Sequence, residues 1–336
     1  MSSRLTREIF QDPLVAGDVP YAVLTPAGWT KDEALPLVIV LHGANSSCEF
    51  LAMVQPIVDG MWDDGSLPRS MIACASTPTA GGFYIDHPGG DAWESLITEA
   101  FPRMLAKEYG VDSTRVSLMG SSMGGYGVLK IAFADPARWQ AAAAVAPALL
   151  PALSPQDLRP RNTIDVLAQL GSEMAGQDQY AENSVLHRAQ SNAAAVRASG
   201  LAIFLRCGDR DMFAMHDGTE QLHRALFDLD IGHEYHLVYD ADHLGPEAIA
   251  SQRAALAFIG AAQRRQAGED RTAADRDLEA AWREWAAGGR QGSPPAFDAF
   301  GVTGPVAMRI LLEPQLSEAA RRDPTAMRRY GILPTD

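Results

Sequence analysis

Short apolar runs alternate with amphipathic stretches along most of the chain. Apolar runs bounded by Gly, Pro or Asp are typical of strands buried on both faces. They occur at residues 21–25, 35–41, 70–76, 116–119, 139–145 and 201–207, and the mixed stretch at 233–239 is also strand-like. Helical spacing fills 48–58, 93–108, the stretch from 128 to about 136, 217–229 and 246–262. This alternation predicts an α/β fold, with a mainly parallel sheet and helices on both faces.

The remaining segments predict additions to this domain. Residues 1–20 indicate a polar arm, so that 21–25 would be an antiparallel edge strand. Residues 148–195 lack strand signals and predict a small cap insertion over the site. The predicted α/β domain spans residues 1–264, and residues 265–336 predict a helical C-terminal extension.

One stripe of apolar residues marks the extension. Leu278, Ala281, Trp282 and Trp285 fall at helical spacing on one face of a helix predicted for about 272–287. Two tryptophans favour burial, so the stripe is expected to dock on the α/β domain or on a second subunit. The second alternative would make a homo-oligomer through the extension.

The most informative stretch is Val116–Gly127, which reads Val-Ser-Leu-Met-Gly-Ser-Ser-Met-Gly-Gly-Tyr-Gly. Within it, residues 120–124 fit G-x-S-x-G, the sharp strand–helix turn that exposes a serine hydroxyl. Side chains at 120 and 124 would collide with the neighbouring strand and helix. The pattern predicts Ser122 as a nucleophile at a helix N-terminus.

A serine needs a base and an orienting acid, which α/β-hydrolases supply in the order Ser, Asp or Glu, His. The strand at 201–207 is followed by Gly-Asp209-Arg-Asp211, and the strand at 233–239 leads to His243. Both lie just past strand ends, where open α/β sheets build sites. Asp211 is the preferred acid and His243 the base, although aspartates in this position are also common turn residues.

The run at 35–41 leads into His42-Gly43-Ala44-Asn45, which predicts an oxyanion loop. Acyl transfer develops charge on the carbonyl oxygen, and two backbone N–H groups usually bind it. Ala44 and Met123 are the candidates. His42 could instead be a packing and hydrogen-bonding residue beside the loop glycine.

The chain resembles a known family in Asp91-Ala-Trp93-Glu94-Ser-Leu, Phe101-Pro102, Tyr109, Arg115 and Gly120-Ser-Ser-Met-Gly-Gly-Tyr-Gly. These residues are similar to the esterase D and putative-esterase branch of the α/β-hydrolases, over roughly residues 20–260. The resemblance implies that Ser122, Asp211 and His243 form the triad. It also implies that the loop at 77–91 helps to wall the site, although the loop could equally be a surface excursion. His42, Tyr84 and Trp93 are candidate substrate-binding residues. Formylglutathione hydrolases of this branch have Leu-Ser-Gly-Leu-Thr-Cys where this chain has Leu41-His-Gly-Ala-Asn-Ser.

The composition of the chain limits the classes of partner that it can bind. The formal net charge of −14 argues against nucleic acid and anionic membranes as partners, and it favours neutral or cationic ligands only mildly. The small-molecule ester expected as the substrate follows from the motifs and the resemblance. The three cysteines are odd in number and widely spaced, which indicates buried thiols. The N-terminus lacks the apolar core of a signal peptide, and the cytoplasm is the expected location.

These observations predict a serine carboxylester hydrolase that works through an acyl-enzyme on small or medium esters, with no cofactor or metal. Acyl transfer, thioester cleavage and peptide cleavage would use the same triad and stay open. A catalytically silent binding protein with this fold is the alternative from another class.

Overall fold

The structure is a computed structural model that describes residues 3–268, 273–295 and 303–322. The chain divides into two compact units, Met1–Gln263 and Arg264–Asp336. None of the helices among the described residues combines the length and the apolar character needed to cross a bilayer.

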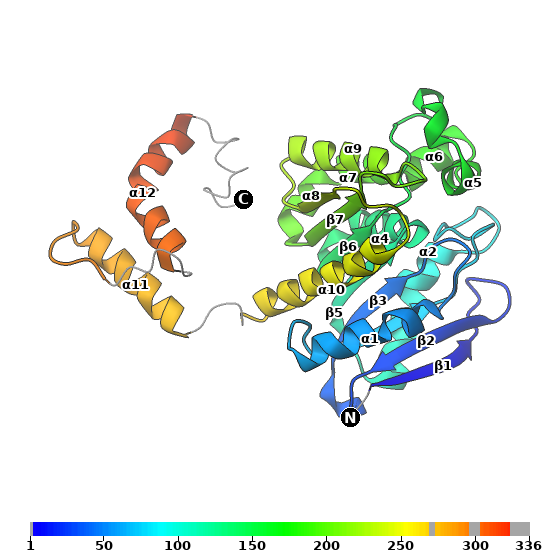
Figure 1. Ribbon diagram of the computed structural model, residues 1–336, viewed down its shortest axis with the longest axis horizontal. Helices are drawn as coiled ribbons and strands as arrows, with labels where there is room; N and C mark the ends of the chain where they lie inside the picture. Colours follow the sequence, from blue (N-terminus) through cyan, green and yellow to red (C-terminus); the bar gives the residue numbers. More distant parts are fainter. Residues whose placement is uncertain (1–2, 269–272, 296–302, 323–336) are drawn as a thin grey trace. The chain divides into compact units, whose positions relative to one another are not determined.

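The first unit is built on one eight-stranded sheet (Figure 1). Its strands, in chain order, are β1 Arg4–Phe10, β2 Val19–Thr25, β3 Pro36–Leu41, β4 Met71–Ala75, β5 Asp112–Ser121, β6 Ala141–Val145, β7 Ala202–Gly208 and β8 Glu234–Val238. They lie in the order β1-β2-β4-β3-β5-β6-β7-β8. The pairs β1–β2 and β2–β4 are antiparallel and all others are parallel. The predicted mainly parallel sheet is confirmed.

The structure corrects the prediction for the N-terminus. Residues 4–10 are a strand and not a polar arm, because they pair with 19–25 along the full length of both strands. Leu5 and Phe10 pack against the core while the charged side chains of β1 stay exposed. β2 is therefore covered on both edges and is not the edge strand.

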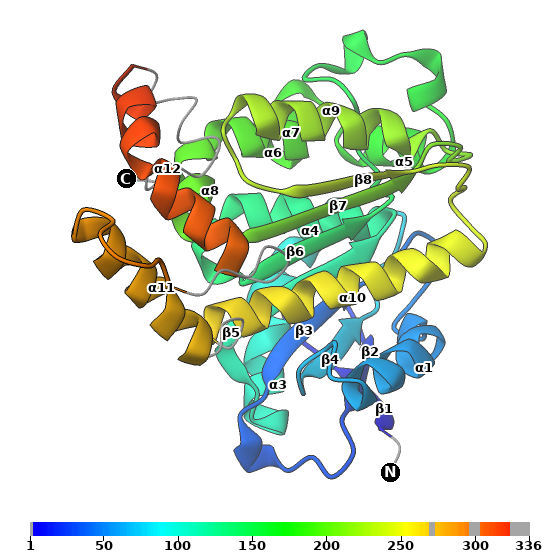
Figure 2. The same cartoon turned by 60° about the vertical axis from the view of Figure 1, so that its left-hand side comes forward.

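Helices cover both faces of the sheet. They are α1 Phe50–Asp63, α2 Trp93–Ser95, α3 Phe101–Tyr109, α4 Met123–Ala134, α5 Asp165–Glu173, α6 Gln177–Asn183, α7 Val185–Ser191, α8 Ala193–Ser199, α9 Met215–Asp228 and α10 Pro246–Gln266. Figure 2 shows α1 and α10 on one face, with α3, α4 and α9 on the other. Burial on both faces explains why β3, β4 and β6 are apolar at every position, whereas the edge strand β8 is not.

One helix between β4 and β5 is interrupted by a wider turn. Residues Leu96–Ala100 form a π-helical turn between α2 and α3. Pro102 has no backbone N–H, so it cannot donate to the carbonyl of Thr98, and Arg138 donates to that carbonyl instead. The interruption therefore follows from the Phe101-Pro102 pair.

The insertion at 148–195 contains helices and turns but no strand among its described residues. α7 packs against α4, and α5 brings two residues to the pocket described below. This segment is therefore partly a sheet-covering layer and partly a wall of that pocket.

The second unit contains α11 Ala273–Ala287 and α12 Thr303–Arg322. Trp282, Ala307 and Ile310 form a small buried cluster, with Leu278, Trp285, Ala286 and Leu311 packed against it. The apolar stripe of α11 therefore docks on α12. The prediction that it docks on the α/β domain or on a second subunit did not include this arrangement, because the sequence of one helix does not show which other helix it packs against.

Candidate active site

Ser122 occupies the sharp turn between β5 and α4. Its backbone has φ 55° and ψ −120°, a conformation rare for residues other than glycine and costing about 1–3 kcal/mol. Three backbone hydrogen bonds hold the turn. The Ser122 N–H donates to Val145 O at 3.0 Å, and Ser122 O accepts from Tyr126 N at 3.1 Å and Ala148 N at 3.0 Å.

The two glycines of the pentapeptide are required by close backbone contacts. A Cβ on Gly124 would lie 1.8 Å from Leu41 O, and one on Gly120 would lie 2.5 Å from Gly124 C and O and 2.9 Å from Leu41 O. No side chain fits at these distances, which confirms the expected collision. The turn thus lies directly against the end of β3, which leads into the oxyanion loop.

Asp211 and His243 come together from the loops after β7 and β8. The His243 Nδ1–H donates to Asp211 Oδ2 at 2.7 Å. Asp211 is buried, and its Oδ1 accepts from Phe213 N at 2.9 Å and Met215 N at 3.4 Å. The Phe213 ring meets the His243 ring edge-on at 4.9 Å between centroids. Because Nδ1 is engaged with the carboxylate, Nε2 is the nitrogen left to act on a substrate.

A neighbouring carboxylate joins these two loops. Asp242 Oδ1 accepts from Met212 N at 2.8 Å and from His243 N at 2.6 Å. These two backbone hydrogen bonds keep the pKa of Asp242 below its usual value, so the carboxylate stays ionised. The loops also touch through the backbone, since Arg210 N donates to Ala241 O at 3.0 Å. The two loops that carry Asp211 and His243 are therefore held together as one unit.

The other aspartate of the motif faces elsewhere. Asp209 donates its backbone N–H to Val238 O, and its buried Oδ1 has no hydrogen-bond partner among the described residues. Of the two carboxylates, the structure places only that of Asp211 on His243.

The predicted oxyanion loop lies beside the nucleophile. A Cβ on Gly43 would be 3.6 Å from the Ser122 Cβ, and Ala44 lines the same pocket as Ser122 and His243. Met123 begins α4, where backbone N–H groups have no partner within the helix. Both candidate N–H groups thus belong to backbone next to Ser122.

The expectation that His42, Tyr84 and Trp93 bind substrate is corrected, because all three are buried and none lines this pocket. His42 Nδ1–H donates to Gly43 O and Nε2 accepts from Thr77 N, both at 2.8 Å. Tyr84 Oη donates to His42 O at 3.0 Å. Burial lowers the pKa of His42, which keeps it neutral. These hydrogen bonds agree with the packing alternative for His42, and through them His42 and Tyr84 brace the predicted oxyanion loop.

An ion-pair network supports the helix that follows Ser122. Lys130 on α4 is fully buried and donates to Glu94 Oε2 at 2.7 Å and Asn183 Oδ1 at 2.9 Å. Arg188 on α7 binds the same carboxylate through both terminal nitrogens and also donates to Lys130 O at 3.0 Å. Burial lowers the pKa of Lys130 to about 8. Although burial opposes it, Lys130 and Arg188 keep the pKa of Glu94 below its usual value.

A pocket of about 390 Å³ opens onto Ser122 and His243. Most of its remaining lining is apolar: Phe50, Met53, Val54, Val166, Phe213, Leu244, Ala248 and Ile249. Its polar side chains include Gln252 of α10 and Asp165 of α5, and no lysine or arginine lines it. The site is therefore shaped for an apolar ligand and carries negative charge at Asp165.

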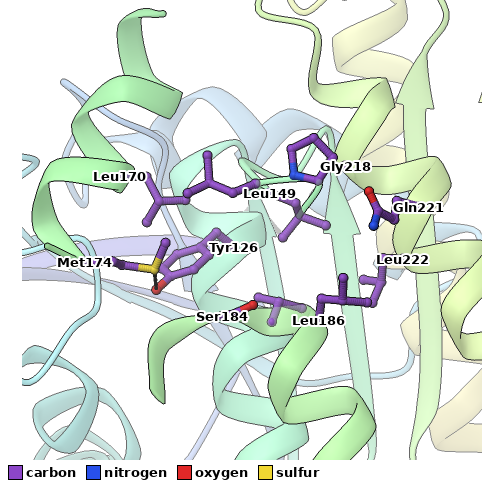
Figure 3. Close-up of a pocket in the computed structure, with 12 residues that line it drawn as sticks. Tyr126, Leu149, Leu170, Met174, Ser184, Leu186, Gly218, Gln221 and Leu222 are labelled. Atoms are coloured by element: carbon purple, nitrogen blue, oxygen red, sulfur yellow. Dashed lines mark hydrogen bonds between the residues drawn. The ribbon is translucent and has the colours of Figure 1, made fainter. Parts of the chain in front are cut away.

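A second cavity lies beneath the insertion and does not reach the triad (Figure 3). Leu149, Leu170, Met174, Leu186 and Leu222 surround it, with Tyr126 at one side. Its volume of about 10 Å³ is roughly that of one water, so it does not accommodate a substrate.

Several of these residues carry no recognisable sequence signal. Gln252 and Asp165 reach the pocket from helices far apart in the chain, and Asp242 is one aspartate among many. Only the position of Asp242 directly before His243 could have indicated its role. Within residues 3–268, 273–295 and 303–322, no three His, Cys, Asp or Glu side chains are grouped so as to hold a metal ion.

The sheet order, the serine turn after β5 and the acid and histidine after β7 and β8 define an α/β-hydrolase fold. The chain belongs to the family described as "Putative esterase", which matches residues 15–244.

Known proteins agree with this assignment. S-formylglutathione hydrolases of Rattus norvegicus and Mus musculus are 34% and 35% identical over 83 and 81 residues, covering 23% and 22% of this chain and 29% and 28% of the relatives. The match thus spans less than a third of their length. A solved ferulic acid esterase has a TM-score of 0.64 at 20% identity, covering 78% of this chain and 98% of its own. A solved S-formylglutathione hydrolase from Agrobacterium tumefaciens has a TM-score of 0.56 at 17% identity, covering 80% of this chain and 95% of its own. Both structures share the fold.

Proposed function

We propose that this protein is a serine carboxylester hydrolase that acts through an acyl-enzyme on small or medium neutral esters. The observation that carries the proposal is the 2.7 Å hydrogen bond from His243 Nδ1 to the buried Asp211, beside a pocket that His243 shares with Ser122. Membership of the esterase family supports the reaction class.

In this mechanism Ser122 Oγ attacks the ester carbonyl carbon while His243 Nε2 takes the hydroxyl proton. Asp211 holds the imidazole orientation and stabilises the imidazolium. The N–H groups of Ala44 and Met123 bind the oxygen that becomes negative in the tetrahedral intermediate. The imidazolium then protonates the leaving alcohol. In the second half of the reaction His243 takes a proton from water, the water oxygen attacks the acyl carbon, and the proton returns to Ser122 Oγ as the acid leaves.

Charge in the pocket favours neutral esters over the glutathione thioesters suggested by the names of the curated relatives. A glutathione thioester carries carboxylates, and basic side chains normally bind such groups. This pocket has Asp165 and no lysine or arginine in its lining. An anionic substrate would therefore meet repulsion with no compensating partner.

The proposal is tested with a fluorophosphonate probe and a series of p-nitrophenyl esters of increasing acyl length. Ser122→Ala should abolish labelling and lower turnover on the order of a millionfold. Ser117→Ala is the matched control, because it removes a buried hydroxyl from the same strand away from the pocket, and it should label normally. Labelling that persists at Ser121 in Ser122→Ala would contradict the assignment. Product analysis with competing alcohols separates hydrolysis from acyl transfer.

A further inference from the structure

Gln252 is a buried polar side chain of the pocket that the proposed reaction does not use. It lies on α10, is 8% exposed and lines the pocket together with Ser122 and His243. Its Nε2 donates to Ser121 Oγ at 2.7 Å. Its Oε1 is buried and has no hydrogen-bond partner among the described residues.

The unpaired Gln252 Oε1 destabilises the fold unless a ligand donates a hydrogen bond to it. A buried acceptor without a partner costs about 1–3 kcal/mol, and most buried polar atoms in folded proteins are paired. The bond to Ser121 fixes the amide by its nitrogen, so the oxygen is the free end. Because Ser121 directly precedes Ser122, this acceptor is anchored next to the reacting hydroxyl.

The rest of the pocket gives the acceptor its selectivity. Aromatic and aliphatic side chains make up most of the lining and offer no competing hydrogen bond. Met53, Leu244 and Ile249 are largely exposed at this pocket. Besides Gln252, the lining includes the polar side chains of Asn45, Ser46, Ser121 and Asp165, but Gln252 Oε1 is the buried acceptor among them that has no hydrogen-bond partner among the described residues. Such an acceptor beside mostly apolar walls suits an apolar chain that carries one donor, since a site built to pair with a donor strongly rejects the analogue that lacks it.

We propose that Gln252 is a specificity-determining residue whose Oε1 accepts a hydrogen bond from a donor on an otherwise apolar acyl group. The donor is a hydroxyl or an amide N–H close to the reacting carbonyl. The substrate class is therefore hydroxyacyl or N-acylaminoacyl esters. This inference rests on the proposed esterase function.

The test compares p-nitrophenyl esters of equal chain length. The pairs are 3-hydroxyhexanoyl against 3-methoxyhexanoyl, and N-acetylglycyl against N-acetyl-N-methylglycyl, each corrected for spontaneous hydrolysis. The wild-type kcat/KM should favour the donor-bearing member of at least one pair by about tenfold or more. The favoured pair identifies whether the donor is O–H or N–H.

Variants assign the preference to Gln252. Gln252→Met keeps the length of the side chain but removes the acceptor, and the donor preference should fall to about one. Ser121→Ala is the second variant, because it removes the anchor and should lower the preference without altering the acceptor itself. Gln263→Met is the matched control, since Gln263 is also a buried glutamine of α10 but does not line the pocket. It should keep the wild-type preference.

The outcomes separate this inference from the proposed function. If the wild type labels at Ser122 and hydrolyses both members of each pair equally, the role of Gln252 is refuted while the esterase function stands. A preference that survives in Gln252→Met also refutes it. If the wild type neither labels nor hydrolyses any ester, the proposed function fails and this inference fails with it.

Discussion

Glu94→Gln should destabilise the protein strongly, although residue 94 does not line the active-site pocket. The Glu94 carboxylate balances Lys130, which is fully buried, and Arg188, whose side chain is 14% exposed. Glutamine keeps the shape and one acceptor but leaves two neighbouring cations without a counter-charge. Breaking a buried pair in this way typically costs about 3–5 kcal/mol. Lys130→Met added to Glu94→Gln should recover part of that loss, because the buried charge is gone.

The destabilisation caused by Glu94→Gln should become smaller as the pH rises. The folded-state pKa of Lys130, about 8, lies below its unfolded value of 10.5, so the folded protein binds fewer protons than the unfolded chain between these values. The contribution of Lys130 to the free energy of unfolding therefore increases with pH between about 8 and 10.5. Glu94 raises the pKa of Lys130, so in Glu94→Gln the increase begins at a lower pH than in the wild type. The difference between the two proteins should be smaller at pH 8.5 than at pH 6.5.

Urea unfolding followed by circular dichroism at both pH values measures these differences. Glu49→Gln is the matched control, because Glu49 also binds an arginine, Arg7, but in an exposed pair whose side chains are 51% and 55% exposed. It should change the free energy of unfolding far less. The reasoning would be refuted if Glu94→Gln cost no more than Glu49→Gln, or if its cost grew with pH.

Three further results are expected. Asp211→Asn should lower kcat about 10⁴-fold while Asp209→Asn changes it less than tenfold, because of the two carboxylates only that of Asp211 contacts His243. If ester assays showed the larger loss in Asp209→Asn, the choice of Asp211 as the acid would be wrong. Asp165→Lys should raise kcat/KM for a carboxylate-bearing ester about 3–10-fold over a neutral one at low salt, and 1 M salt should remove most of the gain. A chain ending at Gln266 should keep probe labelling at Ser122, and light scattering against the full chain tests whether the extension joins subunits.

Much of the fold could be predicted because it rests on local patterns. The runs at 35–41, 71–75 and 201–205 are apolar at every position, since both faces of the sheet are covered. The strand at 4–10 was missed because it is an exposed edge whose pairing with 19–25, and not its own composition, determines its structure.

Some residues of the candidate site could be predicted from local motifs, and others could not. Ser122, Asp211 and His243 follow strands and carry recognisable motifs, so the chain order predicts their meeting. Gln252 and Asp165 reach the pocket from helices distant in sequence, and nothing local marks them. The resemblance suggests His42 and Tyr84 as substrate-binding residues, whereas their hydrogen bonds point into the protein.

The contact of Gly124 with Leu41 O has a consequence for how this chain can diverge. The turn that carries Ser122 and the strand that leads to the oxyanion loop meet through main-chain atoms and the absence of a side chain. Substitutions elsewhere in the core can change volume and shape without moving one relative to the other, provided that residues 120 and 124 stay glycine. A reaction centre positioned in this way tolerates extensive replacement of the surrounding sequence. Solved structures that are only 17–20% identical to this chain accordingly share its fold.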